Sequence, residues 1–291
     1  MQMVNDNVAA NTPRLALVLG SGGVRSIAAL GIADVLTQAG MKPDLVVGCS
    51  SGALFGACIA SGWTGEQGLV AANQLWSAEL TQKKRWRAYF ELIAPRLWGF
   101  GSDFALRDAA LIRARVERAF GATQIADLPT ALRVVATDAA TGRAVVLTRG
   151  SVADAVRASM ALPFMFPSVE IDGRRLTDGV ISDPLPVSAA RDARAIVTVG
   201  FRGSLPRRVD RAARLVAQIT TTMINNLQEA RLAAAAGARM FHFELDIDRR
   251  IGLWETSAMP RIFEAGRRTA LEKMPEIRRV LGHDPTENLA A

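Results

Sequence analysis

Histidine, cysteine and tyrosine are scarce in this chain, which has two histidines, two cysteines and one tyrosine among its 291 residues. The cysteines, Cys49 and Cys58, are too few for a disulfide framework, and their number and spacing do not fit a metal site. No apolar run approaches the roughly 18–20 residues that a membrane-spanning helix needs. Residues 1–13 contain no apolar stretch of the kind found in a signal peptide. We therefore expect a protein of the reducing cytoplasm without a bound metal.

The chain is moderately basic, with a formal net charge of +7, and is 49% apolar and 22% charged. This length and composition fit one large globular domain or two small ones, with a substantial core. The positive charge favours anionic partners such as phospholipid headgroups or nucleic acid, although arginines scattered over a solvated surface explain it equally well. The sequence contains no nucleic-acid-binding module, no Cys/His cluster and no basic low-complexity tail. We therefore expect no nucleic-acid partner.

Apolar runs, glycine-rich turns and helical patterns alternate along the first part of the chain. Residues 15–19 form a predicted buried strand, 20–23 a tight turn and 26–40 a helix that ends at a glycine. Residues 44–47 form the next predicted strand, and a helix follows it through residue 60. Two such consecutive units predict a parallel, doubly wound α/β sheet. Further strands are expected at 132–137, 144–147, 195–199 and 239–245, and further helices at 151–160, 211–236 and 259–281.

The pattern shows no internal repeat and no clear interdomain linker. We expect a single α/β domain over residues 14–281, with a helical insert at 63–103. A flexible segment, 1–13, precedes this domain, and a polar tail, 282–291, follows it.

The insert carries four of the five tryptophans and the only tyrosine. Its aromatic and apolar residues at helical spacing are Trp86, Tyr89, Phe90 and Ile93, and lysines and arginines stand beside them. The pattern favours an ordinary helix that packs its aromatic stripe on the core. The alternative is a lid or a membrane-facing surface, because basic, aromatic-rich amphipathic helices can lie in a membrane interface.

The motif Gly48-Cys49-Ser50-Ser51-Gly52 has the form G-x-S-x-G and lies where a predicted strand turns into a helix. Such a turn exposes the central serine, and Gly48 and Gly52 remove side chains that would clash there. The bare motif arises by chance in roughly one chain in ten of this length. Its place between a strand and a helix makes Ser50 the candidate nucleophile.

A nucleophilic serine needs a base that accepts its proton. The two histidines are His242, in an alternating strand pattern, and His283, in the polar tail; either could complete a Ser–Asp–His triad. Asp178 is the better candidate, because it ends a predicted strand and precedes a glycine that allows close backbone approach. A carboxylate is ionised near neutral pH and becomes a stronger base when it is desolvated. Asp-Gly is, however, also an ordinary turn signal.

A glycine-rich loop stands between the first predicted strand and the first helix. The N–H groups of Gly22, Gly23 and Val24 lie at a helix N-terminus, which suits a developing oxyanion, and Arg25 adds positive charge. The alternative is a phosphate cradle for a dinucleotide. The third glycine of that fingerprint falls on Arg25, however, and no acidic residue ends the second strand. The oxyanion role is therefore favoured.

Three features in this order resemble the patatin-like phospholipase family, in particular its bacterial branch related to neuropathy target esterase. They are the loop Gly20-Ser21-Gly22-Gly23-Val24-Arg25, the motif around Ser50, and Asp178-Gly179. Stretches at 132–138, 155–159, 162–167 and 183–187 extend the resemblance from residue 14 to 281. The resemblance implies a three-layer α/β/α fold with a mainly parallel central sheet.

The resemblance also implies a hydrolase with a Ser50–Asp178 dyad, without a histidine in the mechanism and without a cofactor or metal. Ser50 would attack an ester carbonyl and form an acyl-enzyme, Asp178 would act as the base, and residues 22–25 would stabilise the oxyanion. The implied substrates are phospholipids, lysophospholipids or other acyl esters, met at the inner face of the membrane by peripheral contact. A lipid-binding regulatory homologue with little activity, or an acyltransferase that uses the same acyl-enzyme, remains an alternative.

Three positions depart from the family pattern. Ser26 stands where the glycine-rich loop usually ends in glycine, Ala29 where a histidine is common, and Val180 where glycine or alanine usually follows Asp-Gly. If position 26 needs a positive φ, a serine there costs on the order of 1 kcal/mol and shifts the oxyanion loop. Val180 would narrow the space beside Asp178. These departures predict reduced or altered activity as an alternative to full activity.

Overall fold

The computed structural model describes residues 12–81, 83–98, 101, 104–206, 208–245, 247, 251–252 and 254–282. These residues form one eight-stranded sheet with the order β5-β6-β3-β2-β1-β7-β8, and β4 also pairs with β3. The strands are β1 Leu15–Leu19, β2 Leu45–Cys49, β3 Ala131–Asp138, β4 Ala144–Leu147, β5 Val169–Ile171, β6 Arg174–Asp178, β7 Ala195–Val199 and β8 Met240–Phe243. Most of the predicted flexible segment and of the predicted tail, with His283, lies outside the described residues.

The centre of the sheet is parallel. β1 pairs in parallel with β2 and β7, β2 with β3, and β7 with β8. By contrast, β4 and β6 pair antiparallel with β3, and β5 pairs antiparallel with β6. β1, β2 and β7 are buried along their whole length, as expected of parallel strands that helices cover on both faces. The mainly parallel sheet expected from the sequence is confirmed.

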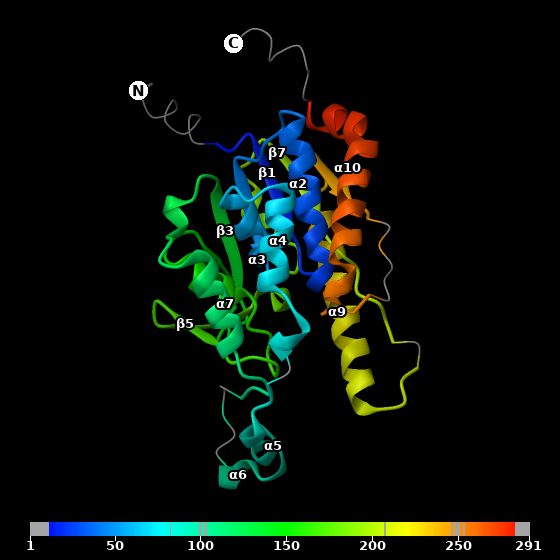
Figure 1. Ribbon diagram of the computed structural model, residues 1–291. Coiled ribbons are helices and arrows are strands. Elements are labelled where there is room, and N and C mark those ends of the chain that lie inside the picture. The colour runs from blue at the N-terminus through cyan, green and yellow to red at the C-terminus, as the bar shows by residue number, and fades with distance from the viewer. Residues whose placement is uncertain are drawn as a thin grey trace, which may run out of the picture.

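Helices cover both faces of the sheet (Figure 1). The side chains of β1 alternate between the two layers. Leu15, Leu17 and Leu19 belong to the larger core, under α2 and α10. Ala16 and Val18 belong to a smaller core on the other face, under the end of α9. The helices are α2 Ala28–Gln38, α3 Ser51–Ala60, α4 Gly65–Leu75, α5 Trp86–Ile93, α6 Pro95–Trp98, α7 Ala110–Phe120, α8 Val152–Ser159, α9 Ala212–Ala234 and α10 Met259–Leu281. This is the expected three-layer α/β/α arrangement.

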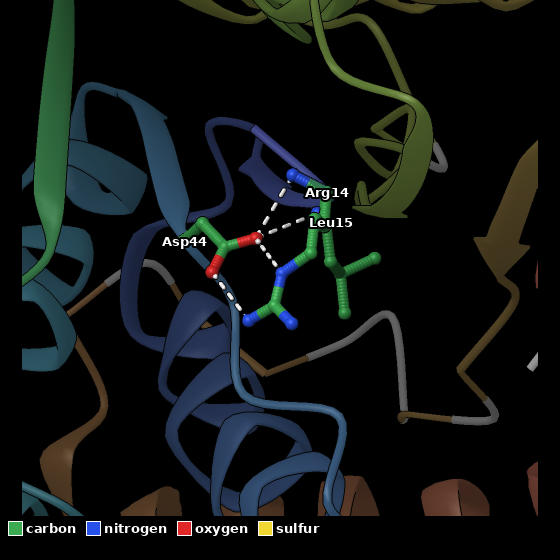
Figure 2. A network of polar contacts seen from close by, with 3 residues as sticks. All are labelled: Arg14, Leu15 and Asp44. Carbon is green, nitrogen blue, oxygen red and sulfur yellow. Dashed lines mark hydrogen bonds and ion pairs between the residues drawn. The ribbon is translucent and has the colours of Figure 1, made fainter. Parts of the chain in front are cut away.

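Arg14 and Asp44 tie the amino ends of β1 and β2 together (Figure 2). Asp44 Oδ2 accepts hydrogen bonds from the backbone N–H groups of Arg14 at 2.9 Å and Leu15 at 3.2 Å, and Oδ1 accepts one from Arg14 Nη2 at 3.2 Å. Burial raises the pKa of Asp44, but these hydrogen bonds outweigh it and lower the pKa overall. Because the contact aligns the starts of two parallel strands, Gly20 and Ser50, which follow them, lie at the same edge of the sheet.

The boundaries predicted for β1, β4, β7 and α10 agree with the structure. The predicted helix at 26–40 is divided, because a short 3₁₀ helix, η1 (Gly23–Ile27), leads into α2. The predicted strand at 239–245 is shorter and forms the edge strand β8. α7 lies in a stretch for which no helix was predicted. Its buried residues are Ile112, Val116 and Phe120, and charged residues stand between them.

The predicted insert, 63–103, contains one part that packs on the core and one part that does not. Trp76 is buried, and α4 lies against the body of the protein. α5 has the opposite arrangement. Its exposed side chains include Trp86, Phe90 and Ile93, and its buried residues are Ala88 and Glu91. The expectation that this helix packs its aromatic stripe on the core is therefore wrong.

Candidate active site

Ser50 lies in a strained turn between β2 and α3. Its backbone has φ 56° and ψ −126°, a conformation that few residues other than glycine adopt. A Cβ atom on Gly48 would lie 2.5 Å from Ala53 Cα, and one on Gly52 would lie 2.5 Å from the Leu19 carbonyl oxygen. Only glycine fits at these two positions without a backbone shift. The turn therefore has the strand–turn–helix geometry of a nucleophile elbow at the carboxyl end of β2.

The Ser50 hydroxyl is in direct contact with Asp178, the last residue of β6. Ser50 Oγ donates a hydrogen bond to Asp178 Oδ2 at 2.8 Å. The backbone N–H of Val180 donates one to Asp178 Oδ1 at 2.9 Å. Thr137 Oγ1 donates to the Asp178 carbonyl oxygen at 2.8 Å. Each carboxylate oxygen thus has its own donor, and both the backbone and the side chain of Asp178 are held in place.

Asp178 is a buried carboxyl group that titrates near neutral pH. Burial raises the pKa of Asp178 to about 7, against the opposing effect of the hydrogen bonds from the Val180 N–H and the Ser50 hydroxyl. A general base is most effective when its pKa lies near the working pH. In the neighbouring Cys49, burial and then the charges of Asp178 and Asp183 raise the pKa of the thiol. Cys49 therefore stays protonated and does not compete as a nucleophile.

One backbone N–H group of the glycine-rich loop has an acceptor within the protein, and two lie in the first turn of a helix. Gly22 donates its N–H to Ser51 Oγ at 3.1 Å, and this leaves it without a free N–H for an oxyanion, in contrast to the expectation from the sequence. Gly23, with φ 61°, and Val24 form the first turn of η1. Backbone N–H groups in the first turn of a helix have no acceptor within it. Gly23 and Val24 therefore remain the candidate oxyanion donors.

Arg25 clamps this loop from the side. Its Nε donates to the Gly22 carbonyl oxygen at 3.2 Å, and its Nη1 donates to the Arg202 carbonyl oxygen at 2.9 Å. The guanidinium carbon lies 5.8 Å from the centroid of the Phe201 ring. The side chain is buried, so its charge acts at short range on the loop. Arg25 therefore orders the loop and also brings positive charge to it.

Ser26 joins the same network. The positive φ on which its expected strain depends is not observed, because Ser26 lies in η1 with an ordinary backbone conformation. Its Oγ lies 2.9 Å from Ser51 Oγ and donates to the Gly20 carbonyl oxygen at 3.3 Å. Together with the bond from Gly22 to Ser51, these contacts link the glycine-rich loop to the first turn of α3. Ser26 thus stabilises the loop instead of straining it.

Ser159, at the end of α8, is a site residue that the sequence did not indicate. It is fully buried, and its Oγ accepts a hydrogen bond from the backbone N–H of Ser50 at 2.8 Å. The same hydroxyl donates to the Val135 carbonyl oxygen at 2.6 Å. Ser159 therefore holds the strained backbone of Ser50 to β3. The two serines are 109 residues apart, and no local pattern signals such a contact.

A cavity of about 190 Å³ contains both Ser50 and Asp178. Gly22, Gly23 and Arg25 line one side. Most of the remaining wall is apolar, and its side chains include Trp76, Met160, Leu162, Phe166, Val180 and Ile224. Val180 thus forms part of the wall beside Asp178, as expected. A few polar groups in a mainly apolar cavity are typical of a site for a small or elongated apolar ligand.

His242 lies apart from this cavity. It is on the edge strand β8, and its Nδ1 lies 2.7 Å from Thr198 Oγ1. Two strands, β1 and β7, separate β8 from β2, which places the histidine about 14 Å from the elbow at ordinary strand spacing. Burial lowers the pKa of His242. The structure therefore gives no support to a triad that includes His242, and His283 lies outside the described residues.

Two features are absent from the described part of the chain. No group of three or more histidine, cysteine, aspartate or glutamate side chains there has a geometry that could hold a metal ion. No helix there is both long enough and apolar enough to cross a membrane.

The family model for patatin-like phospholipases matches residues 17–191. The chain belongs to the patatin-like phospholipase family. The matched segment includes the glycine-rich loop, Ser50 and Asp178. The resemblance identified from the sequence is therefore confirmed.

Similar proteins in this family include an uncharacterized NTE family protein of Mycobacterium tuberculosis. It is 35% identical over 197 residues, which are 67% of this patatin-like chain and 51% of that protein. Patatin-like phospholipase domain-containing protein 7 of Mus musculus is 32% identical over 190 residues, 64% of this chain and 13% of that one. The chain thus spans about half the length of the first of these relatives. The crystal structure of VipD from Legionella pneumophila aligns with a TM-score of 0.48 and 13% identity, over 90% of this chain and 66% of that one.

Proposed function

We propose that this protein is a lipid acyl hydrolase that cleaves phospholipid, lysophospholipid or related acyl esters through a Ser50–Asp178 dyad. The observation that carries the proposal is the 2.8 Å hydrogen bond from Ser50 Oγ to Asp178 Oδ2 in a cavity with mainly apolar walls. Membership of the patatin-like phospholipase family supports the same class of reaction. The dyad, the acyl-enzyme and the choice of ester are the parts that experiment must test.

In this mechanism, Asp178 accepts the Ser50 hydroxyl proton while Ser50 Oγ attacks the ester carbonyl carbon. The negative charge that develops on the carbonyl oxygen is stabilised by the N–H groups of Gly23 and Val24, and Arg25 contributes at short range. The tetrahedral intermediate collapses to an acyl-enzyme, and the leaving alcohol takes the proton from Asp178. Asp178 then takes a proton from the water that attacks the acyl-enzyme. It returns this proton to Ser50 Oγ as the fatty acid is released.

Product analysis tests this proposal and separates it from the two alternatives. We expect purified protein to release free fatty acid from phospholipid or lysophospholipid in detergent micelles, and Ser50→Ala to release none. Transfer of the acyl group to an added alcohol in preference to water would favour the acyltransferase. Lipid binding without turnover, and without labelling of Ser50 by a fluorophosphonate, would favour the regulatory homologue.

The rate of hydrolysis should depend on the ionisation of Asp178. Because the base must be deprotonated, we expect kcat/KM to rise with pH and to level off above an apparent pKa of about 7. The measurement is kcat/KM for a soluble ester whose own ionisation does not change over this range. A profile that is flat through neutral pH, or that rises only near pH 4, would contradict a buried Asp178 as the base.

The Ser51 hydroxyl should act as a positioning group for the oxyanion loop. Ser51→Ala leaves the buried N–H of Gly22 without an acceptor, at a cost of about 1–3 kcal/mol in stability. We expect kcat to fall between about tenfold and a hundredfold, because small displacements of a catalytic loop have effects of this size. Ser26→Ala is the matched control, since it keeps the bond between Gly22 and Ser51 and should lose less. A Ser51→Ala enzyme with wild-type kcat would show that the network does not position the loop.

A further inference from the structure

A segment of the insert turns its apolar side chains outward. We call residues 83–98 the arm; they include α5 and α6. Trp86, Phe90 and Ile93 share one face of α5, and their side chains are 68%, 49% and 80% exposed. On α6, Leu97 is 86% exposed. A helix of a globular protein normally buries such a stripe. Here the ring of Phe90 stacks on that of Trp98 of α6, with 5.0 Å between centroids, and the stripe otherwise stays largely exposed.

A second apolar face lies on α9. The large apolar side chains that are exposed on its amino-terminal half are Leu215, Val216, Ile219 and Met223. Three residues of the same helix, Thr221, Ile224 and Asn225, line the cavity that contains Ser50. In Figure 1, α5, α6 and α9 extend beyond the sheet at the same end of the molecule, opposite the carboxyl end of α10. The apolar face of α9 therefore belongs to a helix that lines the candidate active site, and the arm extends from the same end of the molecule.

Phe164 connects the arm to the wall of the cavity. It is 63% exposed and has φ 64°, a conformation that is rare for a bulky side chain. Its neighbours Leu162 and Phe166 line the cavity. The N–H of Leu106 donates to the Phe164 carbonyl oxygen at 2.8 Å, and the Leu106 carbonyl oxygen accepts from the N–H of Arg85 at 3.0 Å. Backbone hydrogen bonds thus run from the arm to the backbone of Phe164, which lies between two residues of the cavity wall.

The charge around these apolar groups is positive. The charged residues of the arm are Lys83, Lys84, Arg85, Arg87, Arg96 and Glu91. Lys83 pairs with Asp108 outside the arm, and Arg87 pairs with Glu91 inside it. Residues 208–214, at the start of α9, add three arginines and one aspartate. An apolar surface bordered by basic residues complements an anionic lipid bilayer, and each basic residue near such a bilayer strengthens binding about fivefold.

We propose that the arm, Phe164 and the exposed face of α9 form a surface that docks on an anionic phospholipid bilayer. Docking places the apolar side chains at the level of the lipid headgroups and the opening of the Ser50 cavity against the membrane. The proposal deepens the proposed function, because it supplies the route by which an ester of the bilayer reaches Ser50. Binding itself needs no turnover, so the two proposals can be tested separately.

The test uses the full chain with Ser50→Ala, which cannot consume lipid. Co-sedimentation is measured with vesicles of phosphatidylcholine alone and with vesicles that also contain phosphatidylglycerol. We expect binding to the anionic vesicles, weakened by salt, and a decrease of at least about tenfold for Ile93→Glu combined with Leu97→Glu. Leu271→Glu, at a 58% exposed position on α10, is the matched control and should bind like the parent.

Two results would overturn the docking proposal. One is equal binding of the parent and the double arm variant to anionic vesicles. The other is a parent protein that ignores vesicles but forms a dimer that the arm variant cannot form, because the apolar surface would then bind a second copy. Hydrolysis of a soluble short-chain ester by the double arm variant, with Ser50 intact, is the accompanying measurement. If the double arm variant hydrolyses the soluble ester at the wild-type rate but no longer binds vesicles, the arm serves membrane docking and not the chemical step.

Discussion

Asp178→Asn is expected to lower kcat/KM for ester hydrolysis by about 10³–10⁴-fold, a loss typical of removing a member of a catalytic unit. Asparagine has nearly the shape of aspartate and can still accept the hydrogen bond from the Val180 N–H. It cannot take the proton from Ser50. The loss should therefore appear without unfolding, and kcat should fall far more than KM rises.

The same substitution should stabilise the protein at alkaline pH. The pKa of Asp178 is about 7 in the folded protein, well above the value of about 3.9 for an aspartate in an unfolded chain. Between these values the folded protein keeps a proton that the unfolded chain has released, so its free energy of unfolding falls as pH rises toward 7. The variant lacks this titration. We expect its Tm to exceed that of the wild type above neutral pH and the difference to shrink toward pH 4.

Asp138→Asn is the matched control for both measurements. Asp138 also ends a strand, β3, and accepts hydrogen bonds from the N–H groups of Ala140 and Thr141 in a turn, away from Ser50. Its replacement should leave kcat within about twofold, because it removes no group from the cavity. An Asp178→Asn enzyme that keeps wild-type kcat, or that is destabilised above neutral pH, would contradict the role assigned to this carboxylate.

Gly52→Ala should abolish most of the activity and destabilise the fold. The added Cβ would lie 2.5 Å from the Leu19 carbonyl oxygen and 2.6 Å from that of Gly20. Both contacts are to backbone atoms, so the elbow and the glycine-rich loop must move apart. We expect a loss of about 1–3 kcal/mol in the free energy of unfolding from overpacking. We expect kcat to fall at least about a hundredfold, since Ser50 and the oxyanion donors lie on the two segments that separate.

Gly56→Ala, one turn further along α3, is the control for Gly52→Ala. Its added Cβ would meet only side-chain atoms, the nearest being Val46 Cγ1 at 3.1 Å. A small adjustment of that valine can accommodate it, and alanine favours a helix by about 0.5–1 kcal/mol over glycine. Urea unfolding and kcat should thus separate the two variants clearly. Equal behaviour of the two variants would show that the contact between α3 and the glycine-rich loop is not essential.

Local patterns in the sequence predicted the elements whose signals are themselves local. β1 and β7 are short, continuously apolar runs, and α10 has a long helical periodicity, so their boundaries agree with the structure. α7 was missed because charged residues interrupt its apolar face. The aromatic stripe of α5 was expected to pack on the core, but it is exposed. Periodicity shows that residues share a face of a helix, but it does not show whether that face meets the core or solvent.

The same limit applies to the candidate site. The motifs predicted that Ser50 and Asp178 matter, and the structure brings them into hydrogen-bond contact across 128 residues of chain. The roles of Ser159 and Ser51 depend on which hydroxyl lies within reach of which backbone N–H, and this depends on how the strands are arranged. For the same reason the hydrogen bond from the Gly22 N–H to Ser51 Oγ could not be predicted from the sequence. The order of the motifs along the chain indicates the chemistry. Which backbone N–H groups remain free to bind an oxyanion depends on the tertiary structure.

The most direct measurement of the central claim is the rate at which a fluorophosphonate labels Ser50, followed by intact-protein mass spectrometry. We expect equal labelling rates for the wild type and His242→Ala, and a rate at least about a hundredfold lower for Asp178→Asn, because only Asp178 activates the serine. Slow labelling of a folded His242→Ala protein, with wild-type labelling of Asp178→Asn, would contradict the dyad.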